Sequence, residues 1–133
     1  MAARLSGSLL DTSVLVARDP DAALELPESA AISVITLGEL RAGVLIARKK
    51  AVVDERIRRL AAVRAVFAPL PVEEAVADEY GRILAVARTK RRTVKASDLL
   101  IIATAAATFR RLFTLDTAQA QLAADAGIAA TVL

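Results

Sequence analysis

The longest uncharged stretch of the chain runs from Leu99 to Phe109, directly after Asp98. Four bulky aliphatic residues followed by alanines leave no polar face for water, so this stretch predicts a buried helix. Ser97 is a good N-cap residue, and Asp98 in the first turn lies where the helix dipole favours an anion. Taken locally, this pattern favours helix capping by Asp98, and a carboxylate that faces a cleft or a cation is the alternative.

Short apolar segments alternate with helical stripes along the rest of the chain. We expect strands at residues 5–10, 30–35, 65–68, 110–115 and 128–133. Helices are expected at about 37–50, 52–63, 72–89 and 118–126, and a turn followed by a polar helix or loop at 19–28. Because such alternation places strands in parallel with helices on both faces, the predicted fold is a three-layer α/β/α sandwich. It has a central parallel sheet of about five strands and one domain over residues 1–133.

The composition is that of a folded globular chain, with 56% hydrophobic and 25% charged residues among 133. The N-terminal residues lack the apolar core of a signal peptide, and no uncharged run is long enough to cross a membrane. Cysteine is absent, which fits a reducing compartment. We therefore expect a cytoplasmic protein without a membrane partner.

Histidine is absent as well. The chain therefore has no Ser/His/Asp triad, cysteine nucleophile or histidine acid-base pair, and it lacks the usual zinc ligands. Any hydrolysis must use carboxylates, together with a hard metal ion. The net charge of +3 and the pI of about 9.8 fit an anionic partner, although a charge this small does not identify one.

Two acidic residues near the N-terminus have an ordinary structural explanation. Asp11 follows the first expected strand, where it or Ser13 is favoured as the cap of a short helix. Thr36 and Glu39 match a capping box, in which the threonine side chain bonds the amide of the glutamate and the glutamate side chain bonds the amide of the threonine.

Four carboxylates, however, are expected at one edge of the sheet. Asp11, Glu39 and Asp116 each come just after a strand, and Asp98 opens a helix that packs on that sheet. At about 5 Å and an effective dielectric near 20, each like-charged pair costs about 3 kcal/mol. A shared Mg²⁺ or Mn²⁺ relieves this repulsion, because these ions take oxygen ligands and substrate phosphates. The clustering therefore favours a metal site.

Five segments, in this order and spacing, resemble the PIN-domain family and, within it, the small VapC-type toxins of bacterial toxin-antitoxin pairs. They are Leu9–Ser13, Thr36–Gly43, Leu70–Val72, Lys95–Ala105 and Phe113–Asp116. Members often have an aromatic residue a few positions after the fourth acid, where this chain has Gln119, Ala120, Gln121 and Leu122. This departure affects the expected conformation of the last loop and the direction of Asp116.

The resemblance implies a metal-dependent endoribonuclease that acts as a toxin. Its catalytic acids would be Asp11, Glu39, Asp98 and Asp116, and its Mg²⁺ or Mn²⁺ ligands Asp11, Asp98 and Asp116. It further implies that Thr12 and Thr114 orient the carboxylates, that the protein is a homodimer, and that a cognate antitoxin from a neighbouring gene binds it.

An RNA substrate gives the basic segments a candidate role. The loop residues Lys90, Arg91, Arg92 and Lys95 are candidates for contacts with the RNA backbone, and the basic helix face at 56–64 is more often simply solvated. With three Phe and one Tyr, the chain has few side chains on which bases can stack, so shape and phosphate contacts must carry RNA selection.

Two other functions were compared with the ribonuclease. A catalytically silent PIN-like module that binds an antitoxin and contributes to operator binding is the alternative, although all four acids are present. A phosphoacceptor or phosphatase domain of similar architecture would need paired acids after the first strand and a lysine after a late one. Asp11 has no acidic neighbour and no such lysine is present.

Overall fold

The computed structural model describes residues 4–19 and 26–133. In chain order the elements are β1 (Gly7–Leu10), α1 (Thr12–Val16), β2 (Ala30–Ala31), α2 (Val34–Ile46), α3 (Lys50–Val66), α4 (Glu74–Thr89), α5 (Ala96–Ala107), β3 (Arg110–Thr114), α6 (Thr117–Asp125) and β4 (Ala130–Val132). Most of the turn and polar segment expected at 19–28 lies outside the described residues. None of the helices in these ranges has the length and apolar character needed to cross a membrane.

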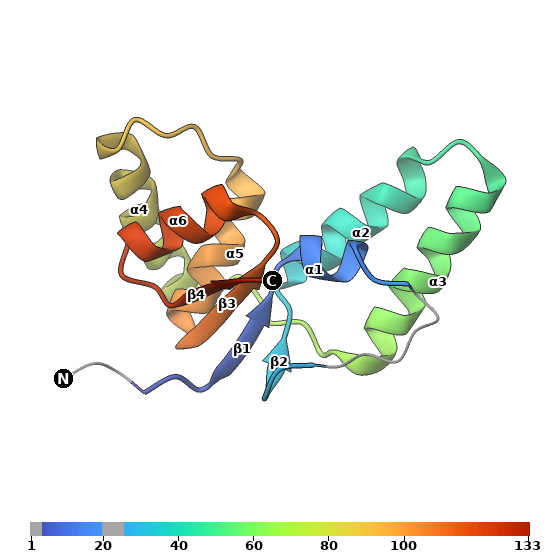
Figure 1. Cartoon of the computed structure of the whole chain (residues 1–133), viewed down its shortest axis with the longest axis horizontal. Helices are drawn as coiled ribbons and strands as arrows, with labels where there is room; N and C mark the ends of the chain where they lie inside the picture. The colour runs from blue at the N-terminus through green and yellow to red at the C-terminus, as the bar shows by residue number, and fades with distance from the viewer. Residues whose placement is uncertain (1–3, 20–25) are drawn as a thin grey trace.

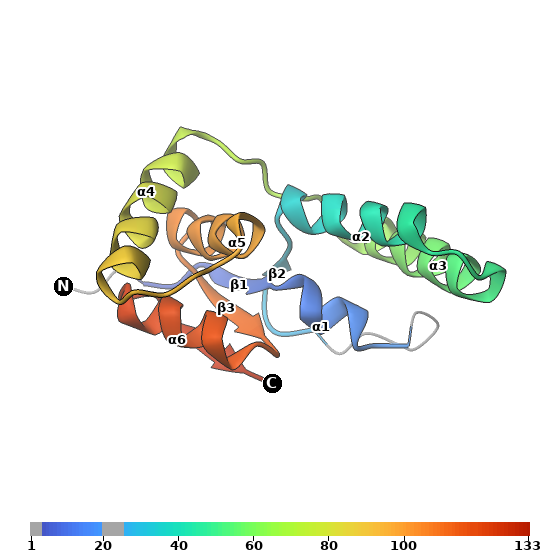
Figure 2. The ribbon, with the colours of Figure 1, turned by 90° about the horizontal axis from the view of Figure 1, so that it is seen from above.

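The strands form one parallel sheet in the order β2-β1-β3-β4. Helices cover both faces: α5 lies over one and α6 over the other, which Figure 2 shows from above. The predicted α/β fold with a helix-covered parallel sheet is therefore confirmed. The sheet has four strands within the described residues, rather than about five.

The prediction of a strand at 65–68 is wrong, because α3 continues to Val66. Leu60, Val63 and Phe67 follow one another at helical spacing, and all three are buried in the same cluster. The apolar residues of this segment are thus buried at helical spacing rather than at the alternating spacing of a strand. Farther along, the chain approaches the sheet edge at Leu70, which makes a single parallel bridge to Ser33.

Two helix starts also differ from the prediction. Helix α2 begins earlier than expected, with Ser33 as its N-cap accepting a 3.1 Å bond from the Ile35 amide, so the capping box at Thr36 is wrong. Helix α5 begins at Ala96 after Lys95, which makes no side-chain capping bond, so Ser97 is not the N-cap. Asp98 is nevertheless in the first turn, as predicted.

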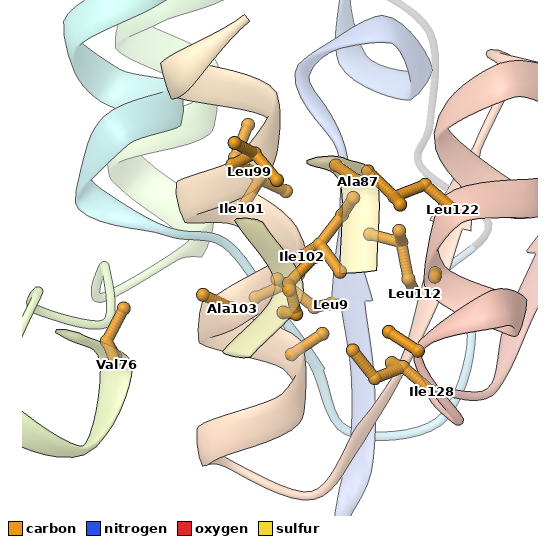
Figure 3. Close-up of a cluster of buried hydrophobic side chains, with 14 of the residues drawn as sticks. Leu9, Val76, Ala87, Leu99, Ile101, Ile102, Ala103, Leu112, Leu122 and Ile128 are labelled. Carbon is orange, nitrogen blue, oxygen red and sulfur yellow. The ribbon is translucent and has the colours of Figure 1, made fainter. Parts of the chain in front are cut away.

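The main hydrophobic core lies between the sheet, α4, α5 and α6. As its sequence predicts, α5 is largely buried. Figure 3 shows Leu9 and Leu112 of the sheet with Ile102 of α5, and with Leu122 and Ile128 beside them. This packing fixes the start of α5 against the ends of β1 and β3.

The pair α2–α3 projects away from the sheet (Figure 1). A second core cluster joins it to the start of the chain through residues such as Leu10, Val14 and Leu40. Toward the far end of α2 large aliphatic side chains remain in solvent: Leu45 is 68% and Ile46 73% exposed. This arm therefore has apolar surface that the protein does not cover itself.

Candidate active site

Asp11 lies directly after β1 and is only 5% exposed. Its Oδ2 accepts hydrogen bonds from the Ser13 amide at 3.2 Å and from Ser13 Oγ at 2.6 Å, and it lies 3.1 Å from Thr114 Oγ1. Its Oδ1 accepts one from Gln119 Nε2 at 3.2 Å. Asp11 is thus the N-cap of α1, as the local pattern suggested, and also the centre of a buried network that joins β1, β3 and α6.

Glu39 lies half-buried in α2, and its Oε1 accepts a 2.7 Å hydrogen bond from Thr12 Oγ1. The hydroxyls of Thr12 and Thr36 are 3.0 Å apart. Thr12, predicted to orient a carboxylate, thus contacts that of Glu39.

Asp98 is half-buried at the start of α5 and makes no hydrogen bond or ion pair with the residues that the structure describes. Burial raises the pKa of its carboxyl, and the negative charges of Asp11, Glu39 and Asp116 raise this pKa further, against a smaller opposing effect of Lys95. The four predicted acids thus lie within electrostatic reach of one another. Asp98 itself caps no amide, so its charge is unpaired.

Asp116 is the exposed N-cap of α6. Its Oδ1 accepts hydrogen bonds from the amides of Ala118 at 2.9 Å and Gln119 at 3.2 Å. The Asp116 amide in turn donates to Thr114 Oγ1 at 3.0 Å. Thr114, for which an orienting role was predicted, therefore contacts two of the acids.

The donor set of this edge consists of carboxylate oxygens, which suits Mg²⁺ or Mn²⁺. Oxygens of Asp98, and Oδ2 of Asp116, have no protein partner within the described residues. In this part of the chain, no group of three or more acids is arranged to hold a metal ion as it stands. Because Mg²⁺ keeps several waters and binds substrate phosphates beside protein carboxylates, these acids fit it without forming a complete cage of protein ligands.

The site contains three polar residues that the sequence did not identify as orienting groups: Ser13, Thr36 and Gln119. Ser13 Oγ donates to Asp11 and accepts from the Leu115 amide at 3.0 Å. Its position two residues after an acidic N-cap was the available signal. No sequence signal marked Gln119 as an orienting residue, because a glutamine in a helical stretch ordinarily lies on the surface.

The basic loop leads into α5, and its last residue, Lys95, directly precedes the helix turn that contains Asp98. Lys90, Arg91 and Lys95 are exposed. Arg92 is instead half-buried and forms a 2.9 Å ion pair with Asp125. Three of the four residues predicted to contact the RNA backbone therefore face solvent, and the fourth, Arg92, forms an ion pair within the protein.

Comparisons with known proteins agree with this architecture. The family model described as PIN domain matches residues 8–125. Ribonuclease VapC8 of Mycobacterium tuberculosis is 45% identical over 100 residues, covering 73% of this chain and 88% of that protein. Ribonuclease VapC5 of the same species is 35% identical over 116 residues, covering 84% of each.

Among solved structures, a match is VapBC-5 of M. tuberculosis, described as a member of the VapBC family of toxin-antitoxin systems. It has a TM-score of 0.82 and 33% identity, and the match covers 95% of this chain and 98% of that one. FitAcB from Neisseria gonorrhoeae has a TM-score of 0.71 and 27% identity, with coverage of 92% and 94%.

Proposed function

The chain belongs to the PIN-domain family, and from this premise we propose that it is a divalent-metal-dependent endoribonuclease that acts as the toxin of a toxin-antitoxin pair. Its relatives carry the name ribonuclease, and a structural neighbour is a toxin-antitoxin complex. We further propose that it acts in the cytoplasm, where an RNA substrate and an antitoxin would both be available.

The observation that carries the proposal is the unpaired charge of Asp98 among three other acids. Burial raises the pKa of Asp98, the charges of Asp11, Glu39 and Asp116 raise it further, and the Asp98 side chain has no partner within the described residues. A fold gains nothing from gathering like charges in this way, whereas a cation site requires it. We therefore assign Asp11, Asp98 and Asp116 as the ligands of Mg²⁺ or Mn²⁺.

A bound divalent ion would activate water and neutralise charge on the phosphodiester. The chain's own residues provide the order that this chemistry needs. Ser13 and Thr114 hold Asp11 through its Oδ2, and Thr12 holds Glu39 at the same edge. Glu39 completes the catalytic quartet, and the fixed carboxylates give the ion and the substrate one defined position.

The exposed cations next to the site would hold the RNA. Lys95 precedes the first turn of α5 and interacts with Asp98 through its charge. Lys90 and Arg91 are exposed in the same loop. Cations placed here would bind phosphates that flank the scissile bond and carry the salt dependence of binding.

The α2–α3 arm is the proposed antitoxin surface. Leu45, Ile46 and Ile57 are exposed there, and an amphipathic partner helix would bury such side chains in a groove. The complex would also block the acidic site, with an antitoxin arginine pairing with the carboxylates. We propose that the toxin is a homodimer in this complex.

Incubation of purified protein with labelled single-stranded RNA tests the proposal, with Mg²⁺, with Mn²⁺ and with a chelator. We expect cleavage with either ion and none with chelator, and cleavage should stop when the antitoxin is added. Cleavage that persists in chelator would exclude the metal mechanism. Binding of the antitoxin without any cleavage under these conditions would instead favour the silent interaction module.

A further inference from the structure

Gln119 is a polar residue in the first half of α6 that is only 3% exposed. Both polar atoms of its side-chain amide are bonded inside the protein. Nε2 donates to Asp11 Oδ1 at 3.2 Å, and Oε1 accepts from Thr114 Oγ1 at 2.7 Å. The opposite orientation would place the amide oxygen against the carboxylate, so the contacts fix which end faces Asp11.

The backbone of the same residue holds a second acid. The Gln119 amide donates to Asp116 Oδ1 at 3.2 Å, as part of the N-cap of α6. Asp11 and Asp116 come from the ends of different strands, and Gln119 bonds both of them. Gln119 therefore links two proposed ligands.

The contact with Oδ1 matters because the other oxygen of Asp11 is already occupied. Oδ2 accepts bonds from the amide and the hydroxyl of Ser13 and lies 3.1 Å from the Thr114 hydroxyl. A carboxylate oxygen offers about two lone pairs. Among the described residues Gln119 is the one donor to Oδ1, which leaves this oxygen a lone pair for a cation.

We propose that Gln119 is a positioning residue, which fixes Asp11 Oδ1 as a single-oxygen ligand and holds it in register with Asp116. The inference rests on the proposed function, because it requires the divalent ion at this edge. Gln119 contacts no position assigned to RNA, so it acts through the carboxylates. Groups that orient metal ligands in this way typically contribute 10-fold to 100-fold to metal affinity.

The test is a Mn²⁺ titration of RNA-free protein, with free Mn²⁺ measured by electron paramagnetic resonance. Gln119→Met removes the amide but keeps an unbranched side chain of similar size, which the buried site can accommodate. We expect a Kd for Mn²⁺ at least about tenfold weaker than in the wild type. Gln121→Met is the matched control, because Gln121 is exposed two residues later on α6, and its Kd should be unchanged.

The outcomes separate the two claims. A folded Gln119→Met variant that binds Mn²⁺ as tightly as the wild type overturns the positioning role and leaves the proposed function intact. A wild type that binds no Mn²⁺ removes both. Should Gln119→Met not fold, Gln119→Asn withdraws the amide by one methylene while staying polar, and the same loss of affinity is required of it. In RNA cleavage, kcat should fall and KM for RNA should not change.

Discussion

Neutralising Asp98 should make the metal-free protein more stable. Asp98→Asn keeps the shape of the side chain and removes its charge. In the wild type this charge repels those of Asp11, Glu39 and Asp116, and no hydrogen bond with a described residue compensates. The substitution therefore relieves repulsion without breaking a contact.

The expected gain follows from Coulomb's law. If each pair is taken at one Debye length, about 8 Å, with an effective dielectric of about 20, each pair costs about 2 kcal/mol, and screening by physiological salt reduces this to about 0.8. Three repulsive pairs, less the attraction to Lys95, leave a net repulsion of about 1.5 kcal/mol that the substitution removes. The substitution also removes the favourable interaction of the Asp98 charge with the helix dipole, which costs about 0.5 kcal/mol. The net gain is about 1 kcal/mol. With about 2.1 cal/mol/K per residue over 133 residues, Tm rises by about 4 °C.

The gain depends on pH in a defined direction. Burial and the neighbouring acids raise the pKa of Asp98 above 3.8 in the folded state, so the folded wild type binds this proton more tightly than the unfolded chain. The stability that Asp98 contributes is fully present below pH 3.8, and it is lost as the pH rises through the raised pKa of the folded state. The variant should therefore melt above the wild type at neutral pH, and the difference should close in acid.

Thermal melts in chelator and in Mg²⁺ measure both effects. At a hundredfold excess over its Kd, Mg²⁺ should stabilise the wild type by about 2.7 kcal/mol, or about 10 °C, and Asp98→Asn by less. Glu74→Gln is the control, because Glu74 is an exposed first-turn acid of α4 that does not act on Asp98. It should melt slightly lower and respond to Mg²⁺ as the wild type does. A fall in Tm for Asp98→Asn in chelator would refute the reasoning.

Three further substitutions test separate contacts. Thr12→Val removes the 2.7 Å hydrogen bond to the Glu39 carboxylate, so Tm should fall by about 4 °C, for a loss of about 1 kcal/mol, and cleavage should slow; an unchanged Tm and rate contradict this. Arg91→Gln, measured in the Asp98→Asn background to prevent cleavage, should weaken RNA binding and lower the slope of log affinity against log salt by about 0.7; an equal slope excludes the phosphate contact. Ile46→Lys should abolish co-purification with the antitoxin and leave RNA cleavage unchanged; a full complex would place the interface elsewhere.

The parts of the fold that the sequence predicted are those with a strong, long pattern. Helix α5 was recognisable because nearly every residue after Asp98 is apolar, which no surface helix tolerates. Shorter signals failed. The apolar run at 65–68 fits a strand or a helix end equally well, and packing of Val63 and Phe67 in one cluster decided for the helix. The start of α2 depended on the bridge between Ser33 and Leu70, which is a tertiary contact.

The acids of the candidate site were predicted because β/α alternation brings strand ends to one edge. The groups that hold them were predicted only in part. Thr12 and Thr114 were expected to orient carboxylates, and they contact Glu39 and Asp11 respectively. Gln119 could not be recognised, because its partner Asp11 lies 108 residues away in the sequence and only the packing of α6 brings them together.

The central claim is that the acids hold the ion that RNA cleavage requires. The most direct test is the initial rate of RNA cleavage in Mg²⁺ by Asp98→Asn, with Asp78→Asn on the exposed face of α4 as the matched control and circular dichroism to verify folding. The account predicts no detectable cleavage by folded Asp98→Asn and a wild-type rate for Asp78→Asn. A near-normal rate for Asp98→Asn would contradict it.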